Sequence, residues 1–131
     1  MTQEQKELIL KDLCARLQYG AKISVNDNVE ILQGINILDN VVEYGSFLSS
    51  DIEEVKPYLF PLSSMTEKQK QEYTYIVNYI SFDDTENWKE GEFIYVEQFT
   101  QLMHFYHINH LDYMGLIPMG LAIDATGLDI Y

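Results

Sequence analysis

The chain has 131 residues, 47% of them hydrophobic, which suits a single globular domain spanning residues 1–131 with a hydrophobic core. Its 21 acidic residues against 8 lysines and arginines give a formal net charge of −13, which disfavours direct binding to nucleic acid or to an anionic membrane. The lone cysteine excludes an internal disulfide, and no apolar run approaches the roughly 20 residues of a membrane span, so we expect a soluble, cytoplasmic protein.

The first predicted element is a helix over residues 2–17. Thr2 and Gln5 have the spacing of a capping box at its start. Apolar side chains recur at helical spacing on one face, at Leu10, Leu13, Cys14 and Leu17, and Ile9 widens that stripe. We therefore expect Cys14 to be a small core residue, because nothing around it supplies the exposed, electropositive setting of a reactive thiol.

Short β-branched runs broken by turn residues follow, and they predict an antiparallel meander of four or five strands. Residues 21–25 and 29–32 are expected to form a hairpin around a three-residue loop. Gly34 marks a bulge, Asp39 and Asn40 suit a reversal into residues 41–44, and Gly45 and Ser46 turn the chain again. We expect the last strand of the meander near residues 52–55.

Two prolines then enclose a short aromatic stretch at residues 56–62. Pro57 and Pro61 favour extended backbone in themselves and in the residue before each of them. Because proline lacks the N–H donor of a strand, we expect this segment to be a stiff connector without regular ladder pairing.

The second half predicts two more helices. Thr66 and Gln69 have capping-box spacing at the start of a helix that runs to about residue 81, with an apolar stripe of Tyr73, Ile76, Val77 and Ile80. The acidic residues 83–92 suit an exposed loop pinned by Trp88. A third helix is expected over residues 93–109, with a stripe of Val96, Phe99, Met103 and Tyr106, followed by a tail of short turns and a final extended piece.

These elements predict an α+β fold in which a β-meander packs with three helices. Each apolar stripe needs a partner surface, so we expect all three helices to bury their stripes on one side of the sheet. That arrangement would leave an outer surface dominated by acidic side chains.

The only clustered residues of metal-ligand type are His104, His107 and His110, with Asp112 close behind. Two of these histidines and Asp112 would suffice for a divalent ion, but the spacing lacks the paired histidines and intervening glutamate of common zinc sites. The simpler interpretation is that the histidines occupy the last turn of a helix, where a positive charge is favourable. We expect no metal ion, no cofactor and no catalytic residue.

Ten tyrosines and six phenylalanines are many for this length, and most must belong to the core. Tyr58, Phe60, Tyr75 and Tyr79 lie off the predicted core stripes or in the proline-flanked segment. Exposed aromatic side chains surrounded by acidic residues are typical of a protein interface. These four residues are therefore the predicted protein-interaction site.

Three segments resemble motifs of a family of short proteins encoded by gut anaerobic bacteria, their phages and mobile elements. They are residues 13–20, 56–67 and 110–117, where family members read LCARLPYG, KPYLRPMSSMTEEE and HFDYRGLI. The family has no assigned activity, so the resemblance implies no catalytic residue. Gln18, Phe60 and Met114 stand where the family has Pro, Arg and Arg, which weakens an enzymatic interpretation of the matching segments.

The favoured function is a non-enzymatic protein-interaction or regulatory accessory factor of bacterial or phage origin, acting through an acidic, tyrosine-rich surface. One variant of this hypothesis is that the acidic surface mimics nucleic acid and blocks a DNA-binding protein. The alternative is a small metal-dependent or hydrolytic enzyme that uses the cluster of His104, His107, His110 and Asp112.

Overall fold

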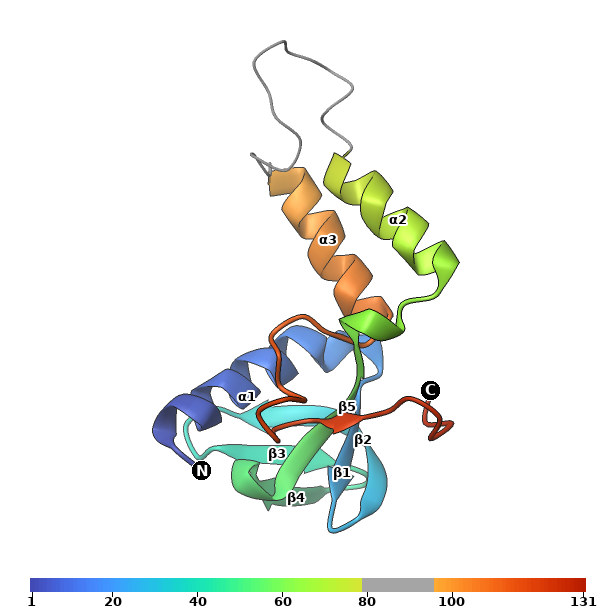
Figure 1. The fold of residues 1–131 in the computed structure, drawn as a ribbon. Helices are drawn as coiled ribbons and strands as arrows, with labels where there is room; N and C mark the ends of the chain where they lie inside the picture. The colour runs from blue at the N-terminus through green and yellow to red at the C-terminus, as the bar shows by residue number, and fades with distance from the viewer. Residues whose placement is uncertain (79–95) are drawn as a thin grey trace.

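The computed structural model describes residues 1–78 and 96–131, and it confirms the α+β class (Figure 1). The helices are α1 (Gln3–Arg16), α2 (Glu67–Asn78) and α3 (Val96–Ile108), with 3₁₀ turns η1 (Leu17–Tyr19), η2 (Ile52–Glu54) and η3 (Leu62–Ser64). The strands are β1 (Lys22–Val25), β2 (Asn28–Asn36), β3 (Val41–Tyr44), β4 (Leu48–Asp51), β5 (Val55–Pro61), β6 (Leu111–Asp112) and β7 (Ile123–Asp124). The predicted acidic loop and Trp88 lie outside the described residues.

Strands β1 to β4 form the predicted antiparallel meander, and the sheet runs β4-β3-β2-β1-β5-β6 with β7 also beside β5. Val25 pairs with Asn28, so the first loop has two residues, one fewer than expected. Asn26 and Asp27 in that loop have φ of 51° and 66°, the left-handed conformation that a tight hairpin turn requires. The register shift between Leu32 and Gly34 confirms the predicted bulge.

The expectation that residues 56–62 lack ladder pairing is wrong for residues 56–61, because they belong to β5, which has paired strands on both sides; Leu62 begins η3. β5 pairs antiparallel with β1 on one side and parallel with β6 and β7 on the other. A proline removes only its own N–H donor, and the remaining groups still pair: Phe60 N donates to His110 O at 2.8 Å, and Leu59 O accepts from Ala125 N at 2.8 Å. Of the residues 52–55 expected to form the last strand, Ile52–Glu54 form η2 and Val55 begins β5, while β4 ends before them.

Helix α1 confirms its predicted capping box but is rotated from the predicted face. Ile9 and Leu13 of the predicted stripe are buried and Leu10 packs against the core, but Asp12 and Arg16 are buried in place of Cys14 and Leu17. Cys14 is consequently exposed, and its predicted core position is wrong. The rotation places the Asp12–Arg16 ion pair in the interior, which an apolar pattern does not reveal.

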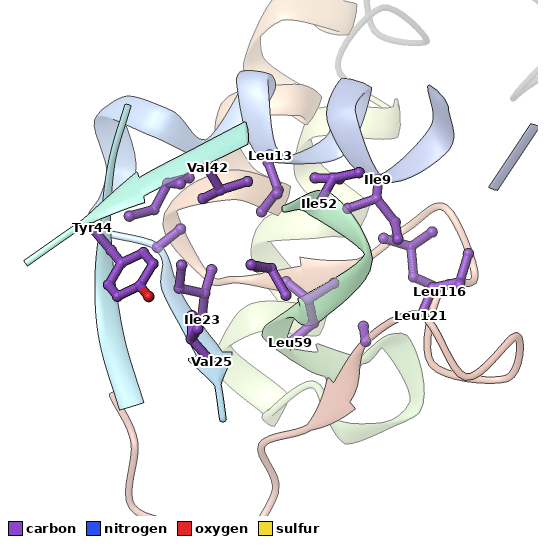
Figure 2. Close-up of a cluster of buried hydrophobic side chains, with 14 residues drawn as sticks. Ile9, Leu13, Ile23, Val25, Val42, Tyr44, Ile52, Leu59, Leu116 and Leu121 are labelled. Carbon is purple, nitrogen blue, oxygen red and sulfur yellow. The ribbon is translucent and has the colours of Figure 1, made fainter. Parts of the chain in front are cut away.

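Helix α1 covers the sheet through one hydrophobic cluster (Figure 2). Ile9 and Leu13 of α1 meet side chains from the meander and from the tail, and the central residues have no exposed surface. The fully buried members in Figure 2 include Ile23, Val42, Ile52, Leu59 and Leu116.

Helices α2 and α3 do not lie over the sheet as predicted. They form a hairpin that projects from the β-sheet body (Figure 1), and a second, separate cluster holds it together. Phe105, Tyr106 and Leu111 are the buried members of this cluster, and Tyr73 and Ile76 of α2 pack against them. Pairing of Phe60 with Leu111 joins the base of the hairpin to β5.

Candidate functional site

The candidate site is a groove of about 780 Å³ on the α2–α3 hairpin. Ile76 and Tyr75 line it from α2, while Phe99 and Met103 line it from α3. Most of the surface that lines the groove is apolar. The groove is therefore suited to an apolar ligand.

Two of the groove's aromatic side chains face solvent to an unusual extent. Tyr75 is 63% exposed and Phe99 is 53% exposed. Phe99 belongs to the stripe that was expected to be buried, so that expectation is wrong for this residue. An apolar stripe left open on two adjacent helices is a feature of binding surfaces rather than of a packed core.

Polar contacts between the helices hold the groove walls at both ends. At one end, the buried Gln98 side chain donates through Nε2 to Ile76 O at 3.1 Å. At the other end, Gln69 Nε2 donates to Asn109 Oδ1 at 3.1 Å. These bonds fix the separation of the helices before any ligand arrives, which reduces the ordering that binding requires.

The end of the groove nearest the sheet is polar, with Tyr19, His104, His107 and Asn109 in its lining. Tyr19 Oη lies 3.1 Å from His104 Nδ1, and its ring lies against that of His107 with centroids 5.3 Å apart. His107 Nε2 in turn lies 2.8 Å from Tyr113 Oη. The groove thus combines an apolar length with one hydrogen-bonding end.

His107 is held in its neutral form. Burial lowers its pKa from 6.5 to about 4, and the nearby Arg16 guanidinium acts in the same direction. Burial also raises the pKa of the Tyr113 hydroxyl, which keeps that group protonated. At neutral pH His107 and Tyr113 therefore act as neutral donors and acceptors.

The structure does not bring the predicted metal-ligand residues together. His104 and His107 face Tyr19, whereas the His110 ring stacks on Tyr131 with centroids 3.6 Å apart. Asp112 is buried and accepts from the backbone N of Leu116 at 2.8 Å. Within residues 1–78 and 96–131, no three His, Cys, Asp or Glu side chains are arranged to hold a metal ion. The four side chains on which the enzymatic alternative rests therefore do not converge on one point.

The four residues predicted to form an interaction site have different positions. Tyr58 is only 7% exposed within β5, so its expected exposure is wrong. Phe60 is half-buried against the second cluster, and its ring lies 5.9 Å from that of Tyr131. Tyr75 is exposed as expected and lines the groove. Tyr79 lies outside the described residues.

A buried polar network lies beneath the groove's polar end. Arg16 Nε donates to Asp12 Oδ2 at 2.9 Å, and Arg16 Nη2 donates to Leu111 O at 2.6 Å. The guanidinium also lies over the Tyr113 ring, 5.2 Å from its centroid. Burial raises the pKa of the Asp12 carboxyl, and the Arg16 charge opposes that rise. This network fixes α1 to the chain that follows α3.

The three segments that carry the family resemblance meet at this network. Residues 13–20 supply Arg16 and Tyr19, residues 110–117 supply Tyr113, and β5 pairs with β6 at Phe60 and Leu111. Segments nearly a hundred residues apart in the chain thus make one junction between the sheet and the α2–α3 hairpin. The motifs therefore coincide with a structural joint that supports the groove.

Sequence reasoning missed Phe99, Tyr19 and Gln98 as site residues. Phe99 was assigned to a buried stripe, and Tyr19 lies in a turn far from α3 in the sequence. For Gln98 the sequence gives one indication of its role, because its polar side chain lies next to the apolar Phe99 within an otherwise amphipathic helix. A buried glutamine at such a position commonly bonds backbone of a neighbouring element.

Comparison with family models, with curated proteins and with solved structures found no match for the chain. Among the residues that the structure describes, no helix has the length and apolar character needed to cross a membrane.

Proposed function

We propose that the protein is a non-enzymatic protein-interaction module whose α2–α3 groove binds an amphipathic, basic helix of a partner protein. The observation that carries this proposal is the open apolar groove with Tyr75 and Phe99 more than half exposed on its two walls. A helix that places apolar side chains at i, i+3, i+4 and i+7 fits a groove of this kind. We propose that the protein acts in the cytoplasm of a bacterium and is encoded either by that bacterium or by a phage.

Charge supports a basic partner. The net charge of −13 attracts a cationic partner, and no lysine or arginine follows Lys89, so the charged side chains of α3 and the tail are only acids and histidines. Glu72 lines the groove on the α2 side. Complementary charge speeds association and selects among partners, while the apolar contacts supply most of the affinity.

The test uses a designed peptide of about 18 residues with leucine on one helical face and lysine elsewhere. Fluorescence anisotropy would measure its binding to the protein, with an affinity in the roughly micromolar range expected. Phe99→Ser is expected to weaken binding by about ten-fold or more, because it removes an apolar anchor without changing net charge.

Two controls separate groove binding from general attraction to an acidic protein. Leu38→Ser changes an equally apolar and more exposed side chain, 94% exposed on a hairpin far from the groove, and should leave binding unchanged. A peptide with glutamate in place of lysine should not bind. Equal affinities for wild type and Phe99→Ser, or an equal loss in Leu38→Ser, would refute the proposed groove site.

A further inference from the structure

The turn between β3 and β4 contains a phenylalanine, Phe47, that contributes no burial to the fold and strains the backbone. Phe47 is 105% exposed, so its ring gains nothing from burial. Its φ of 68° is also in the left-handed region, which bulky side chains rarely adopt and which glycine adopts freely. A residue that is strained and also fully exposed is typical of a functional position rather than of a structural one.

Phe47 lies beside the free edge of the sheet. In the described residues, β4 pairs with β3 alone, so its other edge presents unpaired backbone N–H and C=O groups. Apart from its length of four residues and the charged Asp51 at its end, β4 lacks the devices that protect sheet edges. Its residues are Leu48, Ser49, Ser50 and Asp51, without lysine or proline, and its pairing with β3 shows no bulge.

The surface next to this edge has room for side chains of a bound strand. A hollow of about 520 Å³ is lined by Gln33 and Glu43 on the neighbouring strands and by Phe47, Leu48 and Ser49. Leu48 is itself half-exposed. In strand addition the main chain supplies affinity, and pockets such as this one select the alternate side chains.

The charge of the meander specifies the occupant. No lysine, arginine or histidine occurs between Lys22 and Lys56, whereas that stretch contains seven acids: Asp27, Glu30, Asp39, Glu43, Asp51, Glu53 and Glu54. Two copies of the chain would bring these acids together at a shared edge, and like charges disfavour that pairing. A strand with lysine or arginine side chains would be attracted instead.

We propose that the β4 edge and Phe47 form a second docking surface, which binds an extended, basic segment of a partner protein by strand addition. The segment pairs with β4, an apolar side chain of the segment covers Phe47, and its basic side chains face Glu43 and Asp51. In Figure 1, β4 and the α2–α3 hairpin lie at opposite ends of the molecule, so the proposal does not depend on the function of the groove.

The probe is a displayed library of random peptides about twelve residues long, selected against the full chain. The selected peptides are expected to alternate apolar and basic residues. On binding, they should slow amide hydrogen exchange in Leu48–Asp51, the residues of β4, because new hydrogen bonds protect the outer N–H groups. Phe47→Gly should weaken their binding by about ten-fold or more, while Leu38→Ala, a change at another exposed hairpin tip, should not.

Phe47→Gly also has a stability readout that a structural role predicts in the opposite direction. The variant should raise the midpoint of thermal unfolding, because glycine accepts a positive φ without strain. A lower midpoint would show that Phe47 holds the turn and would overturn the proposal. So would a library that yields no peptides, peptides that bind Phe47→Gly as well as wild type, unchanged exchange in β4, or a dimer of the wild-type chain formed through this edge.

Discussion

The sheet body and the α2–α3 hairpin use their apolar side chains differently. Under α1, Ile9, Leu13 and Ile23 are completely buried in one cluster with contributions from the meander and the tail. In the hairpin, the second cluster has three buried members, and Tyr75 and Phe99 beside it stay more than half exposed. The body therefore carries most of the stability, and the hairpin retains apolar surface for binding.

This difference shows why apolar content alone does not locate a binding site. Both regions leave large apolar side chains exposed, Leu38 and Phe47 on the meander and Tyr75 and Phe99 on the hairpin, but only those of the hairpin line the groove. A two-helix hairpin cannot bury a stripe on every face, because two helices share only one contact surface. The exposed remainder is the groove.

The joint between the two regions is expected to give the largest loss of stability. Arg16→Ala removes one partner of a fully buried ion pair and leaves the Asp12 carboxylate without compensation, at a cost of about 3–5 kcal/mol. Denaturant unfolding followed by circular dichroism measures this change. A loss below about 1 kcal/mol would mean that the joint does not depend on the pair.

A double variant distinguishes an uncompensated charge from lost packing. Asp12→Leu with Arg16→Met replaces the pair by apolar side chains and should recover most of the stability lost in Arg16→Ala. Recovery is expected to be incomplete, because Arg16 also donates to Leu111 O at 2.6 Å, and methionine has no donor for that carbonyl.

Leu13→Ala and Ile76→Ala compare the two clusters directly. Leu13 is 0% exposed, and its truncation should cost about 2–5 kcal/mol through lost burial and a cavity. Ile76 is half-buried at the groove, so its truncation should cost about 1–2 kcal/mol. Denaturant melts of the two variants measure both values. Equal losses would indicate that the hairpin and the body form one core.

Features set by neighbouring residues could be predicted from the sequence. Both capping boxes are present: Gln5 N donates to the Thr2 hydroxyl and Gln69 N donates to the Thr66 hydroxyl, each at 3.1 Å. The bulge at Gly34 and the turn at Asn40 also follow from local conformational preference. Each of these features depends on only a few neighbouring residues, so it can be predicted from the sequence without knowledge of the fold.

Features set by distant residues could not be predicted. The rotation of α1 depends on Arg16 reaching Leu111 O, a contact across 95 residues that rewards burial of a charged side chain. The pairing of β5 with β6 and β7 depends on where the tail returns. The apolar stripe on α3 was visible, but a stripe records which face is apolar and not whether another element covers Phe99.

The pH dependence of stability should sharpen the role of His107, which connects the hairpin to the joint through Tyr113. Its folded-state pKa of about 4 lies below the ordinary value of 6.5, so the unfolded chain takes up a proton first as the pH falls. The contribution of neutral His107 to the free energy of unfolding is complete above pH 6.5 and is lost as the pH falls toward 4. The loss from this residue should be about 1–3 kcal/mol over that window.

His107→Gln isolates this contribution, because glutamine keeps a polar side chain near Tyr113 Oη and does not titrate. His110, whose pKa burial also lowers to about 4, remains in both proteins, as do the acidic residues. The difference between the two stability curves, measured by urea unfolding from pH 7.5 to pH 4, therefore reports His107 alone. Wild type should lose more stability than the variant as the pH falls. Parallel curves would show that His107 meets a water-like environment at the groove's polar end, and that the hairpin is less firmly joined to the body than the 2.8 Å contact with Tyr113 implies.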